Sequence, residues 1–212
     1  MQTIFRTFIL TLTMFTAVSA TAQATTMSAK EFVQSTSQQI LDRIATERTQ
    51  IDSQPTHIYS LIDEILLPHI DFQKMSRSVL GKYWRRASEE QREQFVAEFR
   101  MLLIRTYSTA LLEYSDQTID YLPVRARPEA TDVTVRTEIK RDNGPTIPIS
   151  YDVYNDNGHW LVYDVSIDRV SLVANYRSSF STQIRRRGFD SLIKQLHARN
   201  SKLKNQSVSS DF

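Results

Sequence analysis

The sequence predicts an α+β fold: a curved antiparallel sheet of about four strands, cupped by helices. Apolar residues recur at helical spacing over residues 28–114 and again after Ser171. Between these stretches, apolar and mostly polar residues alternate over 133–140, 147–154 and 161–168, which is the period of strands with one apolar face. Such a sheet packs its apolar face against helices. The periodicity leaves open whether the two layers close solidly or enclose a cavity.

Residues 1–24 have the features of a secretory signal peptide. Arg6 precedes an apolar run over residues 8–18, and small residues mark a cleavage site after Ala24, with an earlier option after Ala20. A membrane anchor is the alternative, but a spanning helix needs about 20 apolar residues. We therefore expect an exported protein with a signal peptide at 1–24, a single domain at 25–200 and a polar tail at 201–212.

The predicted N-terminal helices start at recognisable residues. Ser28 with Glu31, and Ser88 with Gln91, form capping boxes. Asp71 is placed as an N-cap. The predicted helices cover residues 28–51, 55–66, 71–80 and 88–114.

The strand region contains one clear turn. Asp156-Asn157-Gly158 separates two alternating segments and predicts an antiparallel hairpin. A weaker strand is expected at 118–123. Helical spacing returns after Ser171 with a break at Gly188, and the residues from Ser201 onward are polar enough to fray.

Composition excludes several classes of cofactor-binding protein. The chain has no Cys, which removes thiol nucleophiles, iron–sulfur clusters and Cys-ligated zinc. Its four Gly lie too far apart for the glycine-rich loops that hold dinucleotides or phosphates. The four His form no metal-binding pattern, and a net charge of +2 gives no reason to expect nucleic-acid binding. We expect no cofactor and no metal.

Three acidic residues of the strand region have two possible interpretations. Asp152, Asp164 and Asp168 could form a carboxylate group for acid–base chemistry. They fall on the polar faces of the strands, however, so we expect solvated side chains.

Basic residues cluster near two predicted helix ends. Cations suit the last turn of a helix, so the clusters can be ordinary solvated ends. They can also form a docking surface for an acidic partner or a phosphate headgroup. The clusters consist of Arg85, Arg86, Arg185, Arg186 and Arg187.

Three segments in order resemble one known family. They are residues 81–92 (GKYWRRASEEQR), 160–165 (WLVYDV) and 171–180 (SLVANYRSSF). Across the mature chain, the sequence is similar to MlaC-type periplasmic phospholipid-binding proteins, the toluene-tolerance family of the Mla phospholipid-transport system. One departure is Asp168-Arg169-Val170, where the family more often has a Glu-Gly pair. That difference leaves the local backbone open.

The resemblance implies a periplasmic carrier, not an enzyme. Such a carrier holds a glycerophospholipid by its acyl chains in an apolar cavity and works as a monomer or weak associate. Its implied partners are an inner-membrane ABC transporter complex with a substrate-binding ring, and an outer-membrane lipoprotein–porin complex. Shuttling lipid between these complexes maintains the lipid asymmetry of the outer membrane.

A lipid carrier needs a deep apolar cavity. Two sixteen-carbon chains in water cost about 0.8 kcal/mol per methylene, or roughly 24 kcal/mol for about thirty methylenes. The candidates for the cavity wall come from the apolar faces of the helices and strands, and many of them could equally be solid core. These candidates are Phe72, Met75, Phe99, Leu103, Tyr107, Leu111, Val135, Ile149, Tyr151, Tyr163, Val165, Tyr176 and Phe180.

Three alternatives remain at this stage. The chain could carry another lipid, such as a hopanoid. It could be a periplasmic adaptor with a solid core. It could also be a small enzyme with a carboxylate in its pocket, which requires an acidic residue on an inward strand face. None of the predicted inward positions is acidic. These positions are Val133, Val135, Ile149, Tyr151, Tyr163 and Val165.

Overall fold

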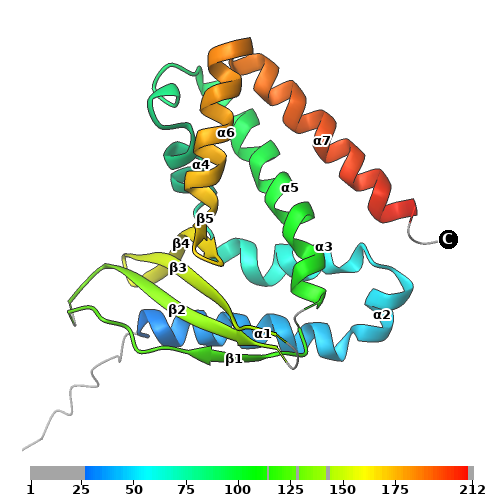
Figure 1. The fold of residues 1–212 in the computed structure, drawn as a ribbon, viewed down its shortest axis with the longest axis vertical. Helices are drawn as coiled ribbons and strands as arrows, with labels where there is room; N and C mark the ends of the chain where they lie inside the picture. Colours follow the sequence, from blue (N-terminus) through cyan, green and yellow to red (C-terminus); the bar gives the residue numbers. More distant parts are fainter. Residues whose placement is uncertain (1–26, 114, 128, 142–143, 210–212) are drawn as a thin grey trace, which may run out of the picture.

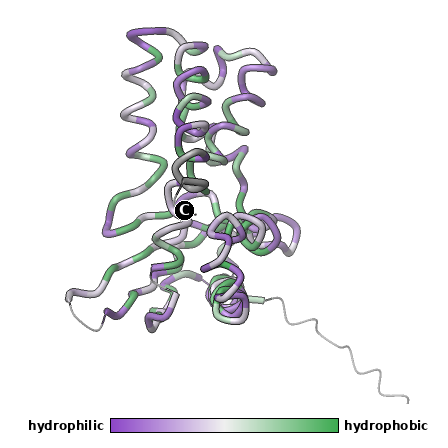
Figure 2. Tube along the Cα trace, turned by 90° about the vertical axis from the view of Figure 1, so that its right-hand side faces the viewer, coloured by the Kyte–Doolittle hydropathy of each residue, from purple (hydrophilic) through white to green (hydrophobic). Residues whose placement is uncertain are grey.

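The computed structural model describes residues 27–113, 115–127, 129–141 and 144–209, so the expected signal peptide lies outside the described residues. A sheet with helix α1 across one face forms one layer, and a group of helices rises from it (Figure 1). Hydrophobic and hydrophilic residues alternate along these helices (Figure 2), as expected where each helix has one buried face. The α+β prediction is confirmed.

The first predicted helix is split in two. Helix α1 (Ala29–Thr46) begins at Ser28, whose backbone N donates to Glu31 Oε2 at 2.8 Å. It ends at Glu47, and α2 (Arg48–Ser53) follows. The Glu47 carboxylate accepts from Arg43 Nε at 2.6 Å and lies 2.5 Å from His57 Nε2. These contacts hold the bend, which the apolar spacing does not reveal.

Residues 57–69 form three short helical pieces instead of one helix. Helix α3 (His57–Leu61) passes into a π-helical turn, η1 (Ile62–Leu66), and then a 3₁₀ turn, η2 (Leu67–His69). Ile70 then bridges to Val162 of the sheet.

The helical layer is built from the remaining helices. Asp71 caps α4 (Phe72–Leu80) by accepting from Lys74 N at 2.8 Å. The capping box of Ser88 and Gln91 precedes α5 (Glu89–Glu113). Helix α6 (Leu172–Arg187) ends at Gly188, where φ is +83°. Helix α7 (Phe189–Ser209) continues past Ser201, beyond the boundary expected for the polar tail.

The sheet has five strands, not about four. All neighbours are antiparallel and the strand order follows the chain, β1-β2-β3-β4-β5. The additional strand, β5, has only two residues, which is too short to show alternation. The strands are β1 (Thr118–Tyr121), β2 (Asp132–Lys140), β3 (Ile147–Asp156), β4 (His159–Ile167) and β5 (Val170–Ser171).

A β-bulge in β4 changes which side chains face inward. Asp152 pairs with Asp164, but Val153 pairs with Val162, so Tyr163 is an extra residue in β4. Because of the bulge, Val162 and Val165 both pack on the apolar side, among the buried residues beside α1. Simple alternation predicts Tyr163 to face inward, and that prediction is wrong.

Candidate functional site

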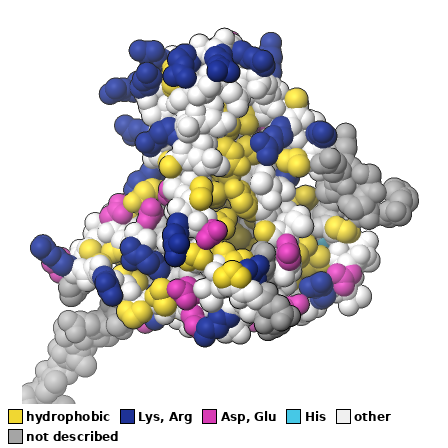
Figure 3. All heavy atoms as spheres, viewed as in Figure 1, with side chains coloured by type: hydrophobic (Ala, Val, Ile, Leu, Met, Phe, Trp, Pro, Cys, Tyr) yellow, Lys and Arg dark blue, Asp and Glu magenta, His cyan; other side chains and the backbone are white. Residues whose placement is uncertain are grey.

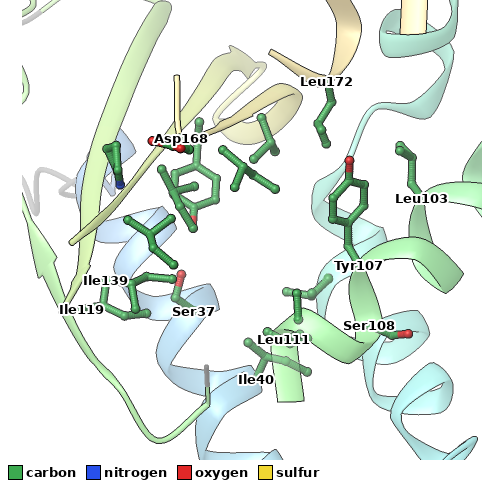
Figure 4. A pocket seen from close by; sticks show the side chains of 18 of the residues that line it. Ser37, Ile40, Leu103, Tyr107, Ser108, Leu111, Ile119, Ile139, Asp168 and Leu172 are labelled. Carbon is green, nitrogen blue, oxygen red and sulfur yellow. The ribbon is translucent and has the colours of Figure 1, made fainter. Parts of the chain in front are cut away.

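A large cavity lies between the apolar face of the sheet and the helices. Its volume is about 900 Å³, near the upper end of the roughly 300–1,000 Å³ typical of ligand pockets. Helix α1 contributes Ile40, α5 contributes Leu103 and Leu111, and β1 and β2 contribute Ile119 and Ile139 (Figure 4). The sheet and the helical layer thus do not close solidly on each other.

The wall of the cavity is mostly aliphatic. Buried α5 residues Leu103 and Ile104 lie opposite half-buried strand residues such as Ile149 and Val165. In Figure 3, hydrophobic side chains line a hollow between the sheet and α5, with charged side chains around it. The interior therefore suits apolar chains, and polar atoms of a ligand would lie near the charged side chains.

The charged lining residues gather at one end of the sheet. Glu138 and Arg141 lie at the end of β2, and Asp168 and Arg169 follow β4. In an antiparallel sheet, the end of β2, the start of β3 and the end of β4 lie at the same end of the strands. We call Glu138, Arg141, Asp168 and Arg169 the charged rim.

The turn of the charged rim is conformationally strained. Asp168 has φ +49° and Arg169 has φ +65°, in the left-handed region that favours glycine. A non-glycine residue held there costs about 1–3 kcal/mol. The two residues form the tight turn between Ile167, the last residue of β4, and Val170, the first residue of β5, which pair with each other. The local backbone that the sequence left open is thus a two-residue hairpin turn.

Many of the predicted wall residues line this cavity. They are Phe72, Met75, Leu103, Tyr107, Leu111, Ile149, Tyr151 and Val165. Whether they touch a ligand stays a prediction. The other predicted residues lie elsewhere: Phe99, Val135, Tyr163, Tyr176 and Phe180.

Three of the predicted wall residues that do not line the cavity form an aromatic cluster inside the helical layer. The Phe99 ring centre lies 5.2 Å from that of Tyr176 and 6.0 Å from that of Phe180. Phe95 completes the cluster, and both Phe95 and Phe99 are fully buried. Helical spacing identifies a buried face but does not say whether that face meets a cavity or other side chains.

Val135 and Tyr163 fail for different reasons. Val135 is fully buried on the inward face, where Phe32 and Val33 of α1 cover it. Tyr163 lies on the other face because of the bulge, and its hydroxyl donates to Asp132 Oδ1 at 2.8 Å. Its ring and that of Tyr154 enclose the ammonium of Lys74, at 4.2 Å and 3.3 Å from the ring centres.

Asp164 is not a solvated strand residue. It is only 8% exposed and accepts hydrogen bonds from Val165 N at 2.8 Å and Val173 N at 3.1 Å. Ser171 Oγ donates to its other oxygen at 2.5 Å. The carboxylate thus binds donors at the start of α6 and has a structural role, because a buried charge needs such partners.

Helix α1 and the π-helical turn η1 supply a part of the wall that the sequence did not predict. Ser37, Ile40 and Leu41 line the cavity from α1, and Ile62 and Leu66 from η1. Their helical spacing marked them as a buried face, but nothing in the sequence separates them from the solid core. The two acidic residues that line the cavity, Glu138 and Asp168, were not among the predicted inward positions and belong to the charged rim.

Burial raises the pKa of two phenols in the cavity wall. Desolvation, with smaller contributions from Tyr176, raises the pKa of Tyr107 to about 12. Burial raises the pKa of Tyr151 to about 12 as well. A phenol is already neutral at ordinary pH, and burial extends that neutrality to higher pH, so the interior carries no charge from either residue.

The arginine clusters meet at the far end of the helical layer. The 81–88 segment and the junction of α6 with α7 both lie at the end opposite the sheet (Figure 1). Gln91 Nε2 donates to Asp190 Oδ1 at 2.6 Å across this end. Within the described residues, the arginines of this end are all exposed and form no ion pair. We call this set of Arg85, Arg86, Arg185, Arg186 and Arg187 the arginine end.

No group of three or more His, Asp or Glu side chains in the described part of the chain could hold a metal ion. No described helix is long and apolar enough to cross a membrane.

A sheet and helices that enclose a large apolar cavity behind a charged rim define a binding protein for an apolar or amphipathic molecule. The comparisons identify the family. The chain belongs to the MlaC family, because the family model described as "MlaC protein" matches residues 34–198. This confirms the resemblance seen in the sequence motifs.

Two relatives are similar to this chain over most of its length. The toluene tolerance protein ttg2D of Pseudomonas putida is 30% identical over 161 residues, which cover 76% of this chain and 74% of the relative. The intermembrane phospholipid transport system binding protein MlaC of Haemophilus influenzae is 28% identical over 193 residues, covering 90% and 88%.

A solved structure has the same fold. The phospholipid-binding protein of Ralstonia solanacearum, determined in complex with a phospholipid, superposes with a TM-score of 0.78 at 30% identity. The match covers 84% of this chain and 99% of that chain.

Proposed function

We propose that the protein binds a glycerophospholipid by its acyl chains and carries it between membranes. The cavity of about 900 Å³, with its apolar wall and charged rim, is the observation that supports this proposal. A relative of the same fold holds a phospholipid, and another is named as a phospholipid transport binding protein.

The energetics of lipid transfer favour a site of this kind. Two acyl chains with about thirty methylenes in total would cost roughly 24 kcal/mol in water when they leave a bilayer. Apolar contacts in the carrier must offset that cost. The aliphatic wall from α1, α5 and the strands offers such contacts. The lipid headgroup then lies toward the charged rim, where its polar atoms stay near water.

Membership of the MlaC family supports a proposal about the transport system and the compartment. We propose that the leader at 1–24 directs the chain to the periplasm, where it acts as a monomer. It would exchange lipid with an inner-membrane ABC transporter complex containing a substrate-binding ring and with an outer-membrane lipoprotein–porin complex. This exchange maintains outer-membrane lipid asymmetry, and it needs no catalytic step by this chain.

The arginine end is the proposed docking surface for one of these complexes. Its exposed guanidinium groups have no carboxylate partners among the described residues, so an acidic surface could pair with them. Reversal of Arg185, Arg186 and Arg187 to Glu should weaken association with a membrane complex. A matched triple reversal of the exposed Arg125, Arg127 and Arg136, on the sheet layer, should not. Equal binding by both triple variants would remove this docking surface.

One experiment tests the carrier function directly. The protein is purified without detergent, extracted with organic solvent and analysed by mass spectrometry against lipid standards. We expect about one phospholipid per chain. A bound hopanoid would assign another lipid, and a chain with nothing bound would contradict the carrier function and favour an adaptor or an enzyme.

A further inference from the structure

The charged rim contains both signs of charge at the same end of the cavity. Arg141 and Arg169 supply two cations, and Glu138 and Asp168 supply two carboxylates. An apolar site needs no charged residues at all, so this mixture calls for a ligand group that can use both signs. A phospholipid headgroup with a phosphodiester and an ammonium group has that property.

Arg141 is held in place by its surroundings. Its Nε donates to Pro145 O at 3.0 Å. A Cβ at Gly144 would lie only 2.9 Å from its Nη2, so the absence of a side chain there makes room for the guanidinium. The rest of the guanidinium has no carboxylate partner within the described part of the chain, and it can bind an anion.

Asp168 and Arg169 are placed beside the same strand. Asp168 N donates to Pro148 O at 2.9 Å, which ties the turn to the start of β3, close to Pro145. Figure 4 shows the Asp168 side chain at the edge of the pocket. Neither residue has an ion-pair partner among the residues described, so their charges remain available to a ligand.

We propose that the charged rim selects phospholipids with a zwitterionic headgroup. Arg141 and Arg169 bind the phosphodiester, and Asp168 binds the ammonium of a headgroup such as ethanolamine. An anionic headgroup such as phosphoglycerol satisfies the arginines but leaves Asp168 without a cation, which lowers its affinity. This inference rests on the proposed carrier function and adds the class of lipid.

The test compares bound lipid with available lipid. The protein is expressed in a bacterium whose envelope contains both phosphatidylethanolamine and phosphatidylglycerol, and it is purified without detergent. Mass spectrometry then gives the ratio of the two lipids on the protein and in the membranes. We expect the bound ratio to favour phosphatidylethanolamine by about two- to fivefold, the size of one partly exposed ion pair.

Two variants with a matched control separate the roles. Asp168→Asn keeps the size and tolerates the left-handed backbone, and it should remove the enrichment. Arg169→Asn should speed the loss of both lipids to acceptor vesicles, because both carry a phosphodiester. Asp156→Asn, at the last residue of β3 and at the opposite end of the sheet, should change neither quantity.

The outcomes distinguish this inference from the carrier function. A wild-type ratio equal to that of the membranes, or an unchanged ratio in Asp168→Asn, overturns the headgroup selectivity even when one lipid per chain is bound. Absence of any bound lipid overturns the carrier function itself. If the lipid-free protein binds inorganic phosphate through Arg169 while the lipid ratios stay unchanged, the rim is a site for free anions and the proposal fails.

Discussion

The hydroxyl of Tyr154 donates a 2.5 Å hydrogen bond to Asp71 Oδ2, while the other oxygen of Asp71 caps helix α4. This contact and burial, with a smaller contribution from the charge of Asp71, raise the pKa of Tyr154 to about 12. One carboxylate therefore joins β3 to the start of α4. Phe72 and Met75, which line the cavity, follow directly on that helix.

Removal of the Tyr154 hydroxyl should destabilise the protein through Asp71. We expect Tyr154→Phe to lower the free energy of unfolding by about 1–3 kcal/mol, because the acceptor is charged. Asp71→Ala should cost about 1 kcal/mol more, since it also removes the cap. Urea denaturation of both single variants and the double variant gives the coupling free energy between Tyr154 and Asp71. Tyr59→Phe is the control, and equal effects of Tyr154→Phe with and without Asp71 would contradict the link.

A bulky residue in the cavity should displace the lipid. Ala110 lines the cavity on α5, and its neighbour Thr109 is exposed on the same helix. Ala110→Trp fills space that acyl chains would occupy, so bound phospholipid per chain should fall by more than half. Thr109→Trp should retain the wild-type amount. Native extraction with lipid mass spectrometry measures both, and undiminished lipid in Ala110→Trp would place the acyl chains elsewhere.

Phe99 should matter for stability and not for ligand contact. Its ring is fully buried in the aromatic cluster and does not line the cavity. Phe99→Ala should lower the free energy of unfolding by about 3–5 kcal/mol. The lipid content of the folded fraction should stay unchanged. Loss of lipid with unchanged unfolding in urea would instead indicate that the ligand reaches this ring.

His69 should make stability depend on pH. Burial lowers the pKa of His69 below its usual 6.5, and its ring meets the edge of Phe32 at 5.3 Å. The unfolded chain therefore binds a proton more readily than the folded chain. The contribution of the neutral His69 ring to the free energy of unfolding is therefore fully present above about pH 6.5. It is lost as the pH falls through and below that value.

His69→Gln isolates that contribution. The decrease in melting temperature between pH 7.5 and pH 5.5 should be smaller in the variant than in the wild type. An identical decrease in both proteins would show that other groups cause the pH dependence.

Local signals in the sequence predicted much of the fold. The capping box at Ser28, the N-cap at Asp71 and the glycine end at Gly188 each appear where expected. These signals act over a few residues, so the sequence contains all of the information. The bend at Glu47 depends on His57, ten positions away, and no local pattern reports such a contact.

The candidate site was harder to predict because it depends on packing between layers. Leu103 and Phe99 lie one turn apart on α5 and are both apolar, yet Leu103 lines the cavity and Phe99 is enclosed by aromatic rings. The bulge at Tyr163 changes which side chains of β4 face inward, and no residue type in the strand marks its position. Both outcomes depend on partners that are distant in the sequence.

The sequential order of the strands has a consequence for how the sheet assembles. Each strand pairs with the one that precedes it in the chain, and the connections are residues 122–131, 141–146, 157–158 and 168–169. Short connections cost little chain entropy to close, and local contacts favour rapid folding. The β3–β4 hairpin, with its two-residue turn at Asn157 and Gly158, can form first, and the other strands then add to its two edges. The floor of the cavity can therefore form by successive local steps before the helical layer closes over it.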